Sequence, residues 1–294
     1  GVSGFQKSMM AVRMGGHGDI TSERLWHVEM TQQRVGSGVV NDGHLYVSNA
    51  PGIAECIDVK TGQSVWKERL GGTLWGSMLL SGERLYVSID IAGWLGLGIV
   101  NTALSGPPRN KTLGPNDPGK QIQEGSSQLA IVNDFEQTAA VLREAGDEAG
   151  NVGANITVEM HQNSIADNSK STSMLLDMVD SENVFANPDL GNLLWHYDEP
   201  EESCEAAITA LAARSKYWHC KNLQRIHIPE LGRTYFLKVP IPDGDIDYRF
   251  AISAMLDADY DGYFAMEGTR TGDHFSKDGC SVRYVRSLLK ELDA

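Results

Sequence analysis

Four short apolar segments in the second half of this 294-residue chain each end on a side chain that can bind a metal ion. These side chains are Glu159 in "ITVEMH", Asp189 in "VFANPDLGN", His219 in "YWHCKN" and Glu267 in "YFAMEG". The first two intervals between these residues are 30 residues each, which is the length of one strand-helix unit. The third interval is 48 residues, which corresponds to one unit with an insertion. Because all strands of a parallel barrel end on the same face, this spacing predicts that the four groups converge on one site.

The sequence around these residues alternates apolar runs with amphipathic segments, which is typical of strand-helix units in a parallel sheet or barrel. A TIM barrel has eight such units, and about five can be recognised here. The predicted fold class is therefore α/β, with a partial TIM-type barrel over residues 89–294, and the Gly/Pro-rich segment 105–128 is expected to be a long loop near the active site. Strands are expected at 98–104, 156–160, 184–186, 217–219 and 263–266, and helices at 135–149, 173–180, 204–215 and 281–292.

Three carboxylates that converge repel one another, and a divalent cation with oxygen and imidazole ligands is the natural compensation. Each residue also has a structural interpretation when it is taken singly. Asp189 could cap a turn, His219 could be a satisfied core histidine, and Glu159 could pair with Arg225 or Lys221. The four together, in register on consecutive units, favour the metal site.

Residues 89–294 resemble the C-terminal part of the xylose isomerase-like TIM barrels, the superfamily of sugar-phosphate isomerases and epimerases. The resemblance is carried by "DIAGWLGLGIVNTALSG", "VEMH", "NPDLGN", "HCKN", "PDGDIDYRFAISAML" and "YDGYFAMEG". It implies that Glu159, Asp189, His219 and Glu267 bind one Mn²⁺, Mg²⁺, Co²⁺ or Zn²⁺ ion. It also implies that Glu159 and Glu267 are the two catalytic bases, on opposite faces of a sugar whose enediolate the metal stabilises.

The same resemblance implies four substrate-binding residues. His161 lies two residues beyond Glu159, so strand alternation places both on the inner side. Arg225 and Lys221 occupy positions where relatives keep a substrate-binding arginine and the lysine of an HxKD motif, and Asn192 stands where the ketose 3-epimerases use histidine. Asn222 replaces the acid of that motif. A ketose 3-epimerase in particular is therefore not predicted, and Asp247 is expected to cap a helix.

The N-terminal region contains a different pattern, a repeat with a period of 40 residues that relates Trp26 to Trp66 and Tyr46 to Tyr86. Short strands separated by turn pairs such as Asp42-Gly43 predict hairpins of a β-propeller blade. Residues 10–88, with a D-x-K-T-G-x-x-x-W core at 58–66, resemble the pyrroloquinoline-quinone-type propeller repeat. That resemblance implies a scaffold role, and no quinone is expected as a cofactor.

The two patterns meet without a linker, so the predicted domains are 1–88, an all-β propeller-blade fragment, and 89–294, the incomplete barrel. One complete blade and part of a second cannot close a propeller, and the open barrel exposes strand edges, so self-association is expected. The chain begins without an initiator Met, as a processed or partial product would. The barrel relatives are commonly cytoplasmic and the propeller relatives often exported, which leaves the compartment open, with the cytoplasm slightly favoured.

Composition narrows the classes of function. The chain has 25 basic and 39 acidic residues, a formal net charge of −14, and this charge disfavours nucleic-acid binding. It also argues against an apurinic-site endonuclease, which would need a basic groove. No apolar segment is long enough to span a bilayer, and the four dispersed cysteines predict free thiols.

Two functions are compatible with these patterns. The first is a divalent-metal-dependent isomerase or epimerase with a small sugar or sugar phosphate as substrate. The alternative is a non-catalytic propeller-type interaction module joined to a degenerate metal- or sugar-binding barrel.

Overall fold

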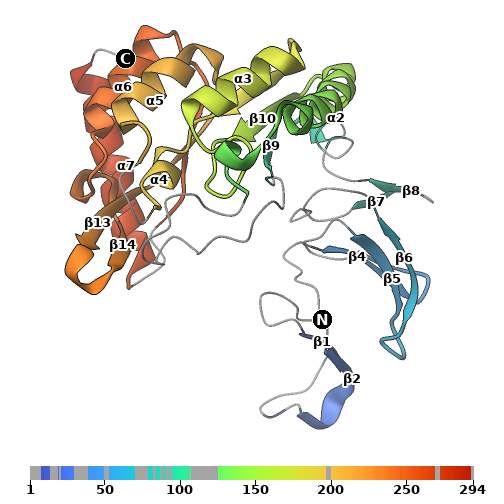
Figure 1. The fold of residues 1–294 in the computed structure, drawn as a ribbon. Helices are drawn as coiled ribbons and strands as arrows, with labels where there is room; N and C mark the ends of the chain where they lie inside the picture. Colours follow the sequence, from blue (N-terminus) through green and yellow to red (C-terminus); the bar gives the residue numbers. More distant parts are fainter. Residues whose placement is uncertain are drawn as a thin grey trace. The chain divides into compact units, whose positions relative to one another are not determined.

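The computed structural model describes residues 8–13, 19, 21–29, 39–49, 53–69, 79–81, 84–86, 89, 92, 95–104, 106, 125–196, 200–268 and 272–292. The chain divides into two compact units, residues 1–95 and 96–294, which are considered separately (Figure 1). The boundary predicted after residue 88 stays a prediction. Most of the expected 105–128 loop lies outside the described residues.

The first unit consists of antiparallel sheets, in agreement with the predicted propeller-blade fragment. Its main sheet has four strands in chain order, β3-β4-β5-β6, and two strand pairs, β1-β2 and β7-β8, accompany it. The strands are β1 Ser8–Val12, β2 Arg24–Glu29, β3 Val39–Asn41, β4 His44–Asn49, β5 Ile53–Asp58, β6 Ser64–Arg69, β7 Leu79–Ser81 and β8 Arg84–Tyr86, with a 3₁₀ turn at Thr21–Glu23.

Two glycine turns fix the register of the main sheet. Asp42 (φ 44°) and Gly43 (φ 73°) form the two-residue turn between β3 and β4, as predicted from the Asp-Gly pair. Gly62 (φ 73°) lies against Trp26, and a Cβ atom at Gly62 would come within 2.6 Å of the indole. The indole Nε1 of Trp26 donates to the carbonyl of Val59 at 2.6 Å, so the tryptophan is held as a scaffold residue.

The parallel strands of the second unit lie at the positions expected from the sequence, within about one residue. Strand β10 pairs with β9 on one side and β11 on the other, β12 pairs with β15, and a single bridge between Ala186 and Ser215 joins the two groups. The side chains of Ile156, Val158 and Trp218 are buried. The strands are β9 Ile99–Ala103, β10 Asn155–Glu159, β11 Val184–Asn187, β12 Tyr217–Cys220 and β15 Tyr263–Met266.

Helices α2, α3, α5, α6 and α7 follow the strands and pack side by side in chain order (Figure 1). The apolar stripe predicted for the first of them is buried at Phe135, Ala139 and Leu142. Asp247 caps α6 by accepting the Phe250 N–H at 3.0 Å, as expected. The helices are α2 Val132–Asn151, α3 Ser169–Val179, α4 Leu190–Leu193, α5 Cys204–Leu211, α6 Tyr248–Asp257 and α7 His274–Glu291, with 3₁₀ turns at Ser127–Leu129, Ala212–Arg214, Pro229–Leu231 and Ile241–Asp243.

An antiparallel hairpin accounts for most of the insertion between His219 and Glu267. Strands β13 (Asn222–Ile228) and β14 (Arg233–Val239) pair along their whole length directly after β12. They are joined by a 3₁₀ turn that ends on Gly232 with φ 58°. The hairpin thus begins at the carboxyl end of a barrel strand, beside the predicted site.

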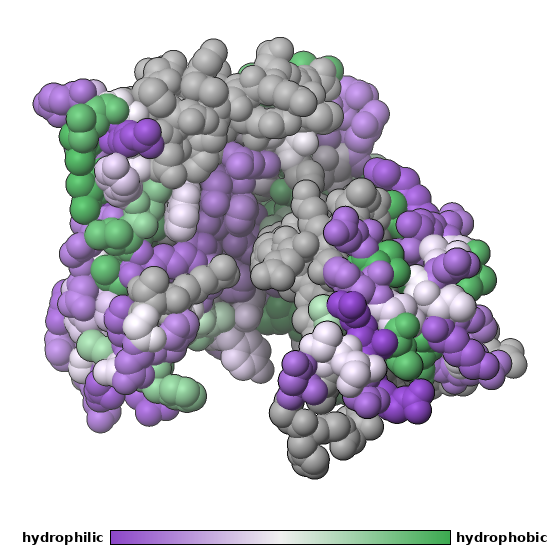
Figure 2. Space-filling model, turned by 90° about the horizontal axis from the view of Figure 1, so that it is seen from below, coloured by the Kyte–Doolittle hydropathy of each residue, from purple (hydrophilic) through white to green (hydrophobic). Residues whose placement is uncertain are grey.

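Hydrophilic residues predominate on the face of the molecule drawn in Figure 2, and hydrophobic residues lie among them in small groups. Scattered apolar side chains of this kind are normal on a protein surface. Within the described residues, none of the helices combines the length and apolar character needed to cross a membrane.

Candidate metal centre

Glu159 ends β10 and is buried, with 7% of its surface exposed. Its carboxylate accepts hydrogen bonds from two amides, Asn101 Nδ2 on Oε2 and Asn192 Nδ2 on Oε1, each at 3.2 Å. Asn101 comes from the neighbouring strand β9, and Asn192 comes from α4. The carboxylate is therefore held in one orientation from two sides.

Asp189 follows β11 and is fully buried. Its Oδ1 atom accepts the Gly191 N–H at 3.1 Å and caps α4, which confirms the capping role considered from the sequence. Its Oδ2 atom lies 2.7 Å from the ammonium of Lys221. The capping bond occupies one oxygen, so the other oxygen remains for a cation, which in this structure is the lysine.

His219 lies on β12, and its backbone N–H donates to Oδ1 of the buried Asn187 at 2.7 Å. The imidazole Nδ1 lies 3.3 Å from Oε2 of Glu159, but it lacks the alignment of a hydrogen bond. This buried nitrogen is thus close to a carboxylate without a well-formed bond to it. Such an atom is suited to a metal ion placed between the two side chains.

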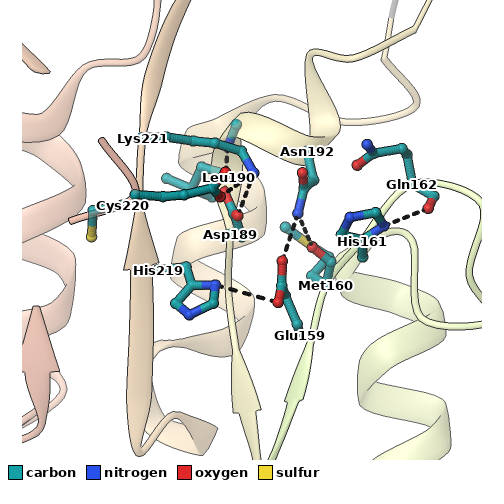
Figure 3. A network of polar contacts seen from close by, with 12 residues as sticks. Glu159, Met160, His161, Gln162, Asp189, Leu190, Asn192, His219, Cys220 and Lys221 are labelled. Atoms are coloured by element: carbon teal, nitrogen blue, oxygen red, sulfur yellow. Dashed lines mark hydrogen bonds and ion pairs between the residues drawn. The ribbon is translucent and has the colours of Figure 1, made fainter. Parts of the chain in front are cut away.

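Glu159, Asp189 and His219 each offer a ligand atom, and these atoms all lie within 4.8 Å of one another. Figure 3 shows Glu159 and His219 turned toward each other, with Asp189 above them. Two carboxylates and one imidazole form a donor set that suits Mn²⁺, Zn²⁺ and related divalent ions. The buried Oδ1 of Asn192 also has no hydrogen-bond partner among the described residues. The residues present therefore fit a divalent metal ion.

Glu267 does not belong to this group in the part of the chain that the structure describes. Its Oε2 lies 2.7 Å from the ammonium of Lys221, and its Oε1 lies 2.6 Å from the ammonium of Lys238. Lys221 therefore bridges Asp189 and Glu267. The pairing of Glu159 with Lys221 that the sequence allowed is not formed, because the lysine takes these two acids instead.

A glycine makes room for the bridging lysine. A Cβ atom at Gly191 would come within 2.5 Å of the Lys221 stem, so the aliphatic part of the lysine lies directly on the backbone of α4. The hydroxyl of Tyr248 donates to the Lys221 carbonyl at 2.8 Å and fixes the backbone. Lys221 is consequently a buried, well-defined member of the site.

The charges in the site shift the pKa values of its carboxylates in opposite directions. Burial raises the pKa of Asp189 to about 7, although Lys221 opposes the shift. Burial also acts to raise the pKa of Glu267, but Lys221 and Lys238 outweigh it and lower that pKa to about 2. At Glu159, burial is outweighed by the neighbouring imidazole of His219, so its pKa is below the usual value.

The imidazole and the bridging lysine respond to the same carboxylates. Burial alone would lower the pKa of His219, but the adjacent Glu159 raises it above its ordinary value. Burial likewise acts to lower the pKa of Lys221, and Asp189 and Glu267 outweigh it, so this pKa is also raised. Without a metal, these shifts favour the protonated form of Lys221, and they also favour retention of protons on Asp189 and His219.

Three of the four predicted substrate-binding residues, His161, Asn192 and Lys221, lie beside this group. In Figure 3, Glu159 lies between His219 and His161, whose Nδ1 is 2.7 Å from the Gln162 carbonyl. Asn192 Nδ2 contacts Glu159 and donates to the Met160 carbonyl at 2.9 Å. Arg225 lies on the hairpin, where its Nε donates to the His196 carbonyl at 3.1 Å.

The Asn222 side chain shows why an amide can stand in the place of the acid expected from the HxKD motif. It donates to the carbonyls of Ile241 and Ile246 and accepts the N–H groups of Leu223 and Ile246. An amide can both donate and accept, whereas an ionised carboxylate only accepts. Asn222 thus holds the loop after the hairpin.

Three residues of the site were not predicted from the sequence. Asn101 orients Glu159, Asn187 donates to Asn101 Oδ1 at 3.0 Å, and Lys238 binds Glu267. The two asparagines interrupt the apolar runs "GIVNTAL" and "VFANP", and such interruptions in buried strands were a usable signal. Lys238 has no comparable signal in the sequence, because polar and apolar residues are mixed along its strand and a lysine there is not unusual.

The fold and the site define a parallel α/β protein of the barrel type with a group that could hold a metal at the carboxyl ends of its strands. A family model described as "Xylose isomerase-like TIM barrel" matches residues 81–290, and the chain belongs to this family. A second model, described as "Outer membrane protein assembly factor BamB", matches residues 18–92. A comparison with curated proteins found no match.

Solved structures share this fold over much of the chain. A xylose isomerase-like TIM barrel protein from Mycobacterium smegmatis, crystallised with magnesium, is 23% identical over 70% of this chain and 65% of its own, with a TM-score of 0.56. A xylose isomerase domain protein from Planctomyces limnophilus is 17% identical (70% and 63%, TM-score 0.50), and an L-ribulose 3-epimerase is 14% identical (70% and 65%, TM-score 0.51). The chain spans less than two thirds of the length of each of these relatives.

Proposed function

We propose that this chain is a divalent-metal-dependent isomerase or epimerase of sugars or sugar phosphates. The observation that carries the proposal is the buried group of Glu159, Asp189 and His219, whose ligand atoms lie within 4.8 Å of one another at the carboxyl ends of parallel strands. Carboxyl ends of barrel strands are where enzymes of this architecture keep their active sites. Membership of the xylose isomerase-like family supports the same class of reaction.

In the proposed mechanism, Glu159, Asp189 and His219 hold the metal, and Glu267 is the fourth ligand proposed from the resemblance. Mn²⁺, Mg²⁺, Co²⁺ and Zn²⁺ are the candidates, and a bound ion of this kind supplies Lewis acidity toward a carbonyl oxygen. The lysine contacts of Glu267 must loosen before it can join the other ligands.

Glu159 is the proposed base that removes the proton next to the substrate carbonyl. The amides of Asn101 and Asn192 fix its carboxylate, and its lowered pKa keeps it ionised at neutral pH. Glu267 is the proposed second base. While both ammonium groups bind it, its pKa of about 2 makes it a weak proton acceptor, so this role requires Lys221 or Lys238 to move away.

His161, Asn192, Lys221 and Arg225 are the proposed substrate contacts. His161 and Asn192 lie around Glu159, where a hydroxyl group next to the reacting carbon would be (Figure 3). Lys221 carries the positive charge closest to Asp189, and Arg225 extends the polar surface onto the hairpin.

The non-catalytic alternative is favoured by one observation. Lys221 bridges Asp189 and Glu267 without a metal, and a degenerate barrel could retain these two ion pairs for a purely structural role. In that case the N-terminal propeller-type region would serve for interactions. A chain that binds no metal would favour this alternative, and turnover of a sugar by the metal-bound chain would exclude it.

The test is calorimetric titration of Mn²⁺ into the purified chain and into a Glu159→Gln variant. Glu291→Gln is the matched control, because Glu291 at the end of α7 forms an exposed ion pair with Arg249 of α6. One ion per chain, lost in Glu159→Gln and retained in the control, supports the enzyme, and a panel of ketoses and aldoses then identifies the reaction. A folded chain that binds no Mn²⁺ would leave the structural alternative.

A further inference from the structure

We propose that Lys238, together with the stacked rings of Trp195 and Phe236, forms a subsite for an anionic group on the substrate. The ligand of this subsite would be a carboxylate or phosphate group attached to a polyhydroxylated carbon chain. This inference rests on the proposed function and deepens it, because it selects charged over neutral sugars.

The hairpin register brings the parts of this subsite together. Arg225 is paired with Phe236, and Leu223 with Lys238, so all four side chains lie on one face of the β13-β14 hairpin. Phe236 stacks on Trp195 from the loop after α4, with ring centroids 5.3 Å apart and planes inclined by 18°. The ammonium of Lys238 lies 5.7 Å from the Trp195 ring centroid.

Lys238 connects this surface to the metal centre. Its ammonium contacts Oε1 of Glu267 at 2.6 Å, while Oε2 of the same carboxylate contacts Lys221, the partner of Asp189. Only 17% of the Lys238 side chain is exposed. A cation this far removed from water needs an anionic partner, and in this structure Glu267 provides one.

The balance of charge then changes when the metal is bound. Glu159, Asp189 and Glu267 supply three negative charges, against the two positive charges of Lys221 and Lys238. A divalent ion leaves one positive charge in excess in a mostly buried site. A substrate that carries a carboxylate or phosphate supplies the missing negative charge, and it can replace Glu267 as the partner of Lys238.

The aromatic pair indicates that the rest of this ligand is a carbon chain or sugar face. Trp195 and Phe236 are both partly exposed, so part of each ring reaches the surface beside the ammonium. Flat aromatic faces bind the C–H groups of carbohydrates through apolar contact, and they leave the hydroxyl groups to polar neighbours such as Arg225. An anion without hydroxyl groups would have no use for a polar neighbour such as Arg225.

The experiment measures binding of polyols that lack a carbonyl and cannot be turned over. With Mn²⁺ present, comparing the Kd values of ribitol 5-phosphate and ribitol tests recognition of a phosphate. Comparing those of gluconate and glucitol tests recognition of a carboxylate. The variants are Lys238→Met, Lys238→Arg and the matched control Lys216→Met. Lys216 also lies over an aromatic ring, Phe185, at 5.6 Å, but it precedes β12 at the opposite end of the strand.

We expect the unmodified chain to bind one of the charged polyols at least about tenfold more tightly than its neutral partner. Lys238→Met should abolish this preference, whereas Lys216→Met should retain it and Lys238→Arg should keep most of it. Equal binding of charged and neutral polyols would overturn the proposal, as would a preference that survives in Lys238→Met or loss of Mn²⁺ binding in that variant. This binding experiment does not depend on turnover. If the chain prefers anions here but shows no isomerase activity on the panel of ketoses and aldoses, the proposed reaction is wrong and the subsite is retained.

Discussion

The Nζ atom of Lys221 lies 2.7 Å from Oδ2 of Asp189, and both side chains are buried. The same ammonium is 2.7 Å from Oε2 of Glu267, so one lysine forms ion pairs with two acids of the site. A divalent ion would have to compete with this internal cation for the same carboxylates. The lysine and the metal are therefore linked in their effects on stability.

Lys221→Met should destabilise the metal-free protein by about 3 kcal/mol, because it leaves the buried Asp189 without its cation, while Glu267 keeps Lys238. Mn²⁺ should recover more stability in this variant than in the unmodified chain, since the ion supplies the missing charge. Thermal unfolding with and without Mn²⁺ measures both effects. The exposed Lys290→Met is the control and should shift the transition little. A Lys221→Met protein that is as stable as the parent without metal would show that the ion pair contributes nothing.

The affinity for Mn²⁺ should rise with pH between about 6 and 8. The pKa of Asp189 is raised to about 7 and that of His219 is raised as well, so both groups must lose protons before they can bind a metal. Each released proton increases the affinity by up to about tenfold per pH unit. Calorimetry in buffers with different ionisation enthalpies counts the protons directly, and a titration without proton release would contradict the assignment of Asp189 as a ligand.

The raised pKa of Asp189 also predicts a change in the stability of the metal-free chain. Its pKa in the folded state lies above the value of 3.8 for an unperturbed carboxyl. The protonated form is favoured by folding, so its contribution is complete at low pH and is lost as the pH rises through about 7. Saturating Mn²⁺ should reverse this trend. Unfolding midpoints at pH 6 and pH 8, with and without the ion, test the sign.

Gly62→Ala should destabilise the N-terminal unit more than Gly43→Ala does. Both glycines have φ of 73°, so each alanine carries the cost of a left-handed residue, about 1 kcal/mol. Only at Gly62 would the new Cβ also meet the ring of Trp26, at 2.6 Å. Overpacking of this kind costs a further 1 to 3 kcal/mol or so. Hydrogen exchange of residues 39–69 measures the difference, and equal effects would mean that Trp26 does not pack tightly on this turn.

The parallel strands of the second unit were predicted correctly, whereas its β13-β14 hairpin was not, and the convergence of Glu159, Asp189 and His219 was expected for a local reason. Glu159, Asp189 and His219 each end an apolar run, and the geometry of parallel strands brings such ends together without further information. The partner of Glu267 could not be predicted in this way. Lys238 is 29 residues distant in the sequence and reaches Glu267 only because an inserted hairpin folds back toward β15.

The amide network shows the same limit. Asn101 is 58 residues from Glu159 in the sequence, and their contact depends on the pairing of β9 with β10. A buried asparagine in a strand signals that some partner exists, but only the register identifies it. The sequence therefore located the polar strand ends, whereas the hydrogen bonds that orient them required the structure.

Strand β9 gives the last prediction, on self-association. Among the described residues it pairs with β10 alone, and an edge of this kind can pair with a strand of a second chain. The carbonyl of Gly98 accepts the N–H of Asn155 on β10. Because the backbone groups of successive residues point to opposite sides of a strand, the N–H of Ala103 points away from β10. Ala103→Pro removes that donor without breaking the β9-β10 ladder. Light scattering should show association that depends on concentration in the parent chain and less of it in this variant, with Ala103→Ser as the control. A parent chain that stays monomeric at high concentration would disprove the prediction.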